Sequence, residues 1–231
     1  DAATFAVSIA LLSRLSPRAV ERLDDAPAKL LAGLKEGWHE VRSRSWVWTF
    51  LGGMAIYHMV VLPSVFVLGP VLMERDYGGA ASWAIVVAAF GAGSILGDLL
   101  VLRWKPNRAL RVATLCLIVA SCQAAIIGSG LSIALIAALE GVSALCVTGF
   151  FVLWETSLQE LIPEASLSRV ASYDMFVSIG LVPVGVAIAG PVAAAIGMEP
   201  TLYGMSAIGI LAALAVLAVP SVRALPRGQT V

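Results

Sequence analysis

Four ionisable side chains interrupt long apolar runs in this sequence: His58, Asp98, Glu140 and Asp174. An ionisable group among apolar residues is costly to desolvate unless it contacts a partner, a cavity or water. A carboxyl group in such a place can hold a proton while it is dry and release the proton when water reaches it. A histidine can relay protons or contact a bound molecule. These residue types therefore predict proton transfer or small-molecule binding at buried positions.

Glu140 and His58 are the candidates for a path taken by a substrate or by protons. Glu140 lies near the middle of the apolar run 131–154, and His58 near the middle of the run 46–73. Each also has a purely structural interpretation. Glu140 would then be a permanently protonated or hydrogen-bonded carboxyl that fixes helix packing, and His58 a neutral imidazole bonded to a nearby carbonyl.

A second set of charges lies towards one end of these apolar runs, and we expect it to form a gate on the cytoplasmic side. Ion pairs such as Glu155 with Arg103 or Lys105 would close that end and open it when they break. The alternative is a set of ordinary interfacial charges that reach water and contribute little energy. The predicted gate comprises Asp98, Arg103, Glu155, Arg169 and Asp174.

The elements that position these residues are predicted from composition and run length. Of the 231 residues, 59% are hydrophobic and 13% charged, and the mean hydropathy is +0.92. Soluble domains average about 45–50% apolar and about 25% charged residues, so a water-soluble globule and a disordered chain are excluded. The 15 Lys and Arg residues balance 15 Asp and Glu residues, which argues against a nucleic-acid partner. The lipid bilayer is the expected environment.

Six apolar runs are long enough to cross a bilayer, which takes about 20 residues. They span residues 46–73, 81–102, 109–128, 131–154, 170–196 and 201–219. The predicted fold class is therefore an all-α integral membrane protein with a six-helix bundle.

Basic residues predict the orientation of these helices. Alternate connections carry 14 and 1 of the 15 Lys and Arg residues, and loops rich in Lys and Arg stay in the cytoplasm. We therefore expect a multi-pass protein of the inner (plasma) membrane, with the linker before the first full helix and the C-terminus both cytoplasmic.

Four segments follow from this topology. Residues 1–12 are expected to be the end of a transmembrane helix whose beginning is missing, 13–45 a cytoplasmic linker, 46–219 the six-helix domain and 220–231 a cytoplasmic tail. Apolar residues recur at helical spacing within the linker, which indicates an amphipathic helix along the inner membrane surface; a solvated connector is the alternative. These apolar residues are Leu30, Leu31, Leu34, Trp38 and Val41.

Three further patterns concern packing. Small residues allow helix backbones to approach closely in lipid, prolines bend helices, and Trp and Tyr gather at membrane interfaces. The predicted contacts involve Ala89, Gly93, Gly97, Gly180, Gly185 and Gly190, and the predicted bends Pro63, Pro70, Pro183 and Pro191. The predicted aromatic belt comprises Trp46, Trp48, Trp83, Trp104, Trp154 and Tyr173.

Two stretches resemble the major facilitator superfamily. Gly91–Asp98 followed by Arg103–Arg108 is similar to that superfamily's loop between helices eight and nine. Leu153–Pro163 followed by Ser168–Asp174 resembles its connection from helix ten to helix eleven, and is nearest to bacterial exporters of the enterobactin-exporter type. The glycines and proline at Gly180, Gly185, Gly190 and Pro191 resemble the Gly-Pro element of the drug-efflux type, the drug/proton antiporters, and support bending of this helix. The resemblance covers nearly the whole chain, as the tail of helix six, the central loop and helices seven to twelve.

This resemblance implies the C-terminal half of a secondary active transporter. It implies alternating access, in which the missing N-terminal six-helix half rocks against this one around a small-molecule substrate. We expect proton-coupled efflux, hence an antiporter, of a small amphipathic or siderophore-like molecule. The alternative is a non-transporting truncated membrane protein, or a half-transporter that needs a partner half.

No enzyme, cofactor or metal site is expected. An intramembrane enzyme that uses His58 and Glu140 lacks any matching motif, such as His-Glu-x-x-His or Gly-x-Ser-x-Gly. The three cysteines lie scattered in apolar runs without a Cys-x-x-Cys pair, which argues against a disulfide framework or a zinc site.

Overall fold

The computed structural model describes residues 2–14 and 26–225, and within these ranges the secondary structure is helical without strands. The chain divides into two compact units, residues 1–35 and 36–231. The first contains α1 (Ala2–Leu12) and the beginning of α2 (Ala26–Ser43). The second contains the remainder of α2 and all six helices that are long and apolar enough to cross a membrane.

The six spanning helices include several that are built from shorter pieces. The first spans Ser45–Asp76, the second is α5 (Ala80–Arg103), the third spans Ala109–Ile127, the fourth is α8 (Ile133–Leu161), the fifth spans Glu164–Ile196 and the sixth is α11 (Met198–Ala218). Helices are expected here because a bilayer offers no hydrogen-bonding partner to the backbone, so the chain must satisfy its own N–H and C=O groups. The fold is an all-α membrane bundle of six helices, as predicted.

The composite helices join α-helical and π-helical pieces. In the first, α3 (Ser45–Ile56) runs into the π-helical turns η1 (Tyr57–Val61) and η2 (Ser64–Leu68) and then α4 (Gly69–Asp76). The third consists of α6 (Ala109–Ala120) and α7 (Gln123–Ile127), and the fifth of α9 (Glu164–Met175), the π-helical η3 (Phe176–Gly180) and α10 (Val182–Ile196). The short α12 (Pro220–Ala224) follows α11.

The boundary between the fourth and fifth helices differs from the sequence expectation. We expected a connection over residues 155–169, whereas the structure leaves only Ile162 and Pro163 between α8 and α9. Hydropathy marks where the apolar run ends, but polar residues beyond it continue the helix. Pro163 then stops α8, because a proline disfavours helical backbone at the residue before it, and Ile162 is extended with φ −99° and ψ 130°.

Prolines lie close to the places where the helices change their winding. Pro63, Pro70 and Pro183 each follow a π-helical turn within a few residues, whereas Pro191 lies inside the α-helical segment α10. Pro63 has no N–H to donate to the carbonyl of Met59, the bond that an α-helix would form there. The predicted bends at the first three prolines thus coincide with locally widened helix.

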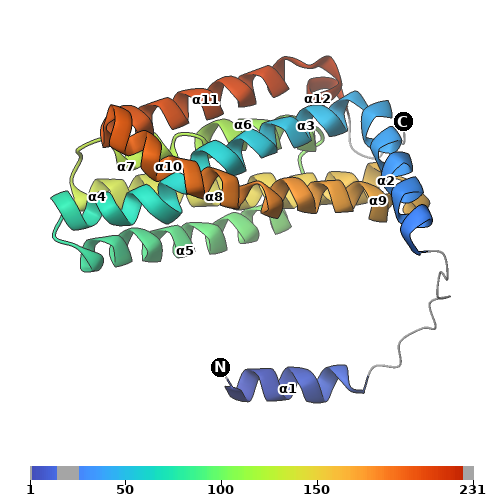
Figure 1. Cartoon of the computed structure of the whole chain (residues 1–231), viewed down its shortest axis with the longest axis horizontal. Helices are drawn as coiled ribbons and strands as arrows, with labels where there is room; N and C mark the ends of the chain where they lie inside the picture. Colours follow the sequence, from blue (N-terminus) through green and yellow to red (C-terminus); the bar gives the residue numbers. More distant parts are fainter. Residues whose placement is uncertain (1, 15–25, 226–231) are drawn as a thin grey trace. The chain divides into compact units, whose positions relative to one another are not determined.

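Close backbone contact between α5 and α8 is the tightest packing in the bundle, and Figure 1 shows the two helices side by side. A methyl group added at Gly93 would lie 1.9 Å from the carbonyl oxygen of Gly141, and one added at Gly97 would lie 2.7 Å from that of Leu145. Both distances are far below van der Waals contact, so these positions require glycine. The predicted small-residue contact of this helix is confirmed.

The glycines of the fifth spanning helix behave differently from our expectation. A methyl group on Gly185 would lie 2.0 Å from the carbonyl oxygen of Met59, so α10 and η1 meet there. Gly190 has open space around it, and Gly180 faces only the ring of Phe176 in its own helix. The expected stripe of three contacts is wrong for Gly180 and Gly190. Gly180 belongs to the π-helical η3, whose winding differs from that of α10, and Gly190 is five residues after Gly185 in α10, which places it on a different helix face.

A stack of aromatic rings forms the core between the first and fourth spanning helices. Phe50 stacks on Trp154 with ring centroids 4.3 Å apart, and Trp46 meets Trp154 edge-on at 5.9 Å. Trp46 and Trp154 are 3% and 0% exposed, so their predicted place in an interfacial belt is wrong. Trp48 and Trp104, by contrast, are half-exposed near helix ends. Burial of large ring surfaces within a helix bundle outweighs the interfacial preference for these two indoles.

The linker helix predicted before the first spanning helix corresponds to α2. Within the second unit, its last turns pack through Val41, which is buried, and Gly37, where an added methyl group would lie 3.0 Å from the ring of Tyr173. Trp38 remains half-exposed, with its ring centroid 5.9 Å from that of Tyr173. Leu34 is exposed, and the side chains of Leu30 and Leu31 lie outside the described residues. The membrane-surface position of α2 stays a prediction.

Replacing Gly93 with alanine should lower the stability of the bundle. The added methyl group cannot fit against the Gly141 carbonyl, so α5 and α8 must separate; overpacking of this kind costs about 1–3 kcal/mol. Gly91→Ala is the matched control, because Gly91 is on the same helix with nothing within 4 Å of its added methyl group. Thermal unfolding in detergent measures both variants, and equal melting temperatures would contradict the contact.

Candidate functional site

A buried chain of three polar side chains connects the first, third and fourth spanning helices. Tyr57 donates its hydroxyl to Gln123 Oε1 at 2.5 Å, and Gln123 donates from Nε2 to Glu140 Oε2 at 3.1 Å. All three side chains are buried, with Glu140 only 1% exposed. Gln123 thus fixes one oxygen of the carboxyl group, and Tyr57 fixes the orientation of the Gln123 amide.

Two apolar clusters lie on either side of this polar layer. The first contains the aromatic stack with Phe50, Phe150 and Trp154, and extends as far as Tyr57. The second contains Ala124 and Ala137, which are close in sequence to Gln123 and Glu140. A polar layer between two dry clusters is expensive to bury unless its groups satisfy one another.

Two polar atoms of this layer lack a hydrogen-bond partner in the described part of the chain. Glu140 Oε1 and the hydroxyl of Ser143 are both buried, and neither has a hydrogen-bond partner among the described residues. These two residues are three positions apart on α8 and therefore lie on the same helix face. A buried polar atom without a partner costs about 1–3 kcal/mol. The arrangement therefore favours a further occupant beside Glu140: a proton, a water molecule or a polar group of a ligand.

A pocket of about 260 Å³ adjoins Glu140. Glu140 is the single polar residue in its lining, and the other lining residues come from the first spanning helix and from α5. Those residues are Leu62, Val65, Phe66, Pro70, Trp83, Val86, Val87 and Phe90. An apolar concave site with one well-placed polar group is the usual form of a small-molecule site.

Local chain geometry brings Gln123 into this layer. The third spanning helix breaks at Ser121 and Cys122, and α7 begins at Gln123. Ser206 of α11 accepts the N–H of Ala125 at 2.8 Å, which holds the restarted helix in place. Tyr57 is the first residue of the π-helical η1. Gln123, the partner of Glu140, and Tyr57, the partner of Gln123, thus both lie at irregular points of their helices, where side chains leave the regular face pattern.

His58, the second residue of the predicted path, is bonded within its own helix. It is buried, and its Nδ1 lies 2.9 Å from the carbonyl oxygen of Met54. A carbonyl oxygen only accepts, so Nδ1 carries the proton. The ring packs against Phe151 at a centroid distance of 5.6 Å. This contact is the one that the structural interpretation of His58 predicts, a neutral imidazole bonded to a nearby carbonyl. No hydrogen bond among the described residues connects His58 to Glu140.

The predicted gate residues are brought together only in part. Asp174 is half-buried and accepts the indole N–H of Trp154 at 2.7 Å. Arg169 pairs with Glu36 of α2 at 3.1 Å, and both side chains are largely exposed. Asp174 therefore links α9 to α8, whereas Arg169 links α9 to α2.

The other gate residues are exposed. Asp98, Arg103 and Glu155 have no ion pair with any described residue. The pairs that we expected between Glu155 and Arg103 or Lys105 are not formed in this structure. Arg103 and Lys105 lie at and just beyond the end of α5, whereas Glu155 is an exposed position within α8. The gate remains a prediction for another conformation.

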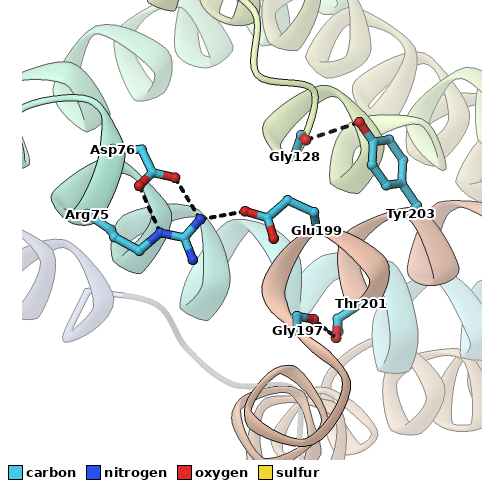
Figure 2. Close-up of polar contacts among 7 residues, drawn as sticks. All are labelled: Arg75, Asp76, Gly128, Gly197, Glu199, Thr201 and Tyr203. Atoms are coloured by element: carbon cyan, nitrogen blue, oxygen red, sulfur yellow. Dashed lines mark hydrogen bonds and ion pairs between the residues drawn. The ribbon is translucent and has the colours of Figure 1, made fainter.

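A set of polar contacts that we did not predict from the sequence lies at the end of the bundle where residues 77–79 connect α4 to α5. Figure 2 shows Arg75 between Asp76 and Glu199, with distances of 2.7 and 2.5 Å, so the end of α4 is tied to the start of α11. Tyr203 donates to the Gly128 carbonyl at 3.1 Å and ties α11 to the connection after α7. The sequence pattern that could have predicted these ion pairs is Arg75 between the acidic residues Glu74 and Asp76. The Arg75 pairs are about half-exposed, and pairs of this kind contribute little to stability.

Metal ligands do not gather in the described part of the chain: no group there contains three or more His, Cys, Asp or Glu side chains. Cys116, Cys122 and Cys146 are free thiols. The chemistry available at the site is that of one carboxyl, one amide and two hydroxyl groups.

The polar chain should act as an energetically coupled unit. Tyr57→Phe removes one end of the network and Glu140→Gln replaces the carboxyl group at its other end, so their effects on the free energy of unfolding should deviate from additivity by about 0.5–3 kcal/mol. Tyr203→Phe is the control, since its hydroxyl bonds Gly128 and is not part of the network. Combined with Glu140→Gln it should be additive within about 0.5 kcal/mol. Additivity of both pairs in a double-mutant cycle would contradict the coupling.

Comparison with known proteins identifies the family. Residues 1–173 of the 231-residue chain match the Major Facilitator Superfamily. No curated protein matches the chain. The match includes the polar layer at Tyr57, Gln123 and Glu140 and four of the six spanning helices in full. This multi-pass membrane protein belongs to the Major Facilitator Superfamily, a family of transporters.

Proposed function

We propose that this chain forms half of a proton-coupled exporter that carries a small amphipathic or siderophore-like molecule outward. The observation that carries the proposal is the buried Glu140 carboxyl, which has one oxygen bonded to Gln123, one oxygen without a partner, and a pocket beside it. The resemblance of Leu153–Pro163 to exporters of the enterobactin-exporter type supports the outward direction.

In this proposal Glu140 exchanges a proton as access alternates. While the site is closed to water, the neutral acid is favoured, because an unpaired carboxylate among apolar residues is costly. When the site opens to the side where the proton is released, water stabilises the carboxylate. Gln123 keeps the group in one orientation through both states, so the proton is gained and lost at Oε1.

The sidedness of the protein follows from its basic residues. The connections 13–45, 103–111, 155–169 and 220–231 together carry 14 of the 15 Lys and Arg residues. We propose that these segments lie in the cytoplasm and that the protein resides in the inner (plasma) membrane.

The gate is proposed to work at this cytoplasmic end. Asp98, Arg103 and Glu155 are exposed and unpaired among the described residues, so they can form new pairs as the end closes. Asp174 and Arg169 already hold α9, through Trp154 and Glu36 respectively. Rearrangement of these contacts would accompany the opening of the path.

A second six-helix half is the proposed partner. In the most apolar stretch of α5 and of the fifth spanning helix, only 17% and 11% of the residues are buried, against 39–50% in the other four. Two helices with so little cover have faces available for another bundle. The same observation favours the alternative function, a half-transporter that must pair with a separate half. Six further helices in frame in the coding sequence upstream of Asp1 would support a single-chain transporter with both halves. A stop codon there would support the half-transporter.

Proton-driven efflux should depend on Glu140. In the full-length protein in vesicles, Glu140→Gln should abolish substrate efflux driven by a proton gradient, because the amide cannot release a proton. The variant should still insert and fold, since Gln keeps the size of the side chain and the contact with Gln123. Glu74→Gln, an exposed acid outside the site, is the matched control and should transport normally. Efflux at the wild-type rate with normal proton dependence would remove Glu140 from the mechanism.

The proposed orientation predicts opposite labelling of two exposed positions. In a background without native cysteines, Asn107→Cys should react with an impermeant maleimide only in inside-out vesicles. Ala80→Cys should react only in right-side-out vesicles, since it begins α5 at the bundle end whose single basic residue is Arg75. Labelling of both positions from one face would refute the topology.

A further inference from the structure

Two of the three cysteines meet where α6 packs against α8. The Cys116 thiol of α6 is in hydrogen-bond contact with the Cys146 thiol of α8. Cys116 Sγ would also lie 3.6 Å from a methyl group added at Gly149. Gly149 is three positions after Cys146 on α8, so the two residues share a helix face. Both contacts therefore place the sulfur of Cys116 on the Cys146 face of α8.

This pair is reduced, and its geometry is suited to a covalent bond. Both thiols are free, and both side chains are partly buried. A disulfide needs its two Cβ atoms about 3.5–4.5 Å apart. Sulfur atoms that already touch reach this range through side-chain rotation and a small shift of the helices. The absence of a side chain at Gly149 lets α6 come close to α8 at this level.

The position of the pair restricts which oxidant can reach it. Cys116 and Cys146 both lie within spanning helices, and Cys116 packs against the apolar cluster that contains Phe150. Charged oxidants are costly to bring into such surroundings. An uncharged organic hydroperoxide dissolves in the bilayer and can reach partly buried thiols from the lipid.

We infer that Cys116 and Cys146 form a redox-active pair, which a membrane-soluble organic hydroperoxide oxidises to a disulfide between the third and fourth spanning helices. One sulfur attacks the O–O bond, its proton passes to the leaving alkoxide, and a sulfenic acid and an alcohol form. The second thiol attacks the sulfenic sulfur, the S–S bond forms, and the hydroxyl group leaves with the proton of that thiol as water. Over both steps each sulfur loses one electron and the hydroperoxide gains two.

The disulfide would connect the two helices that also supply the polar layer. Cys116 belongs to the same spanning helix as Gln123, and Cys146 to the same helix as Glu140. The bond would restrain these helices against each other without removing a group from the layer. Neither cysteine takes part in the proposed proton exchange, so this inference goes beyond the proposed function and does not depend on it.

Cumene hydroperoxide is a suitable probe, because it is uncharged and soluble in lipid. The full-length protein, one copy in each nanodisc, is treated with the probe, digested and analysed by mass spectrometry. We expect Cys116 and Cys146 in one cross-linked peptide pair, two hydrogens lighter than the separate peptides, and dithiothreitol should reverse the change. Cys122 should still react with maleimide, because its thiol bonds the carbonyl of Ile118 at 3.5 Å instead.

Protein cut between the two cysteines provides a second measurement. Residues 130–132, in the connection between the third and fourth spanning helices, are exposed and can accept an inserted protease site. After oxidation and cleavage, the two fragments should migrate together on a non-reducing denaturing gel. Cys116→Ser should separate them, whereas Cys122→Ser is the matched control and should behave like the wild type.

Three results would overturn the inference: both thiols stay reduced, either one gains oxygen without a cross-link, or either one pairs with Cys122. If the inserted site prevents folding, the peptide masses of the uncut protein decide. Proton-driven efflux in Glu140→Gln is measured separately, so failure of the disulfide and failure of the proposed function are distinguishable.

Discussion

Lipid provides no hydrogen-bonding partner, and this absence governs both the fold and the site. Every backbone group within the bilayer must be satisfied inside the chain, which leaves a helical bundle as the solution for these six apolar runs. The same condition applies to the Glu140 side chain, whose carboxyl group needs partners from within the bundle. Gln123 supplies one for Oε2, and Tyr57 in turn bonds Gln123. The second oxygen has no partner among the described residues, and the proposed proton exchange uses this oxygen.

Irregular backbone is concentrated where the polar layer lies. Tyr57 begins a π-helical turn, and Gln123 restarts a helix after a break. Regular helices would place these residues by strict periodicity, whereas a widened turn or a break moves a single side chain off that pattern. The bundle thus uses regular helix for span and apolar packing and irregular helix for positioning polar groups.

Much of the fold could be predicted from the sequence, because the length of an apolar run reports directly on a spanning helix. The Gly93 contact was predictable too, since small residues at four-residue spacing have few other uses in lipid. Trp46 and Trp154 could not be assigned correctly, because burial of a ring depends on which neighbours it meets. Here the two indoles meet each other, and Trp154 also stacks on Phe50. Glu140 could be identified as a candidate site residue because it is an ionisable residue in an apolar run. Its connection to Tyr57 was not, because that contact joins residues 83 positions apart through a glutamine on a third helix.

The contact of Gly93 with the Gly141 carbonyl also restricts how the bundle can move. Sliding α5 along α8 by one turn would bring Val101 to the level of Leu145, where backbone already meets backbone at Gly97. Sliding in that direction is sterically blocked, which restricts how far the two helices can move independently. In the pocket, Trp83 and Phe90 lie on α5 and Glu140 lies on α8. The opposite wall, from Leu62 to Pro70, contains the π-helical turn η2. A change in the width of the pocket would therefore come from flexing of that one wall.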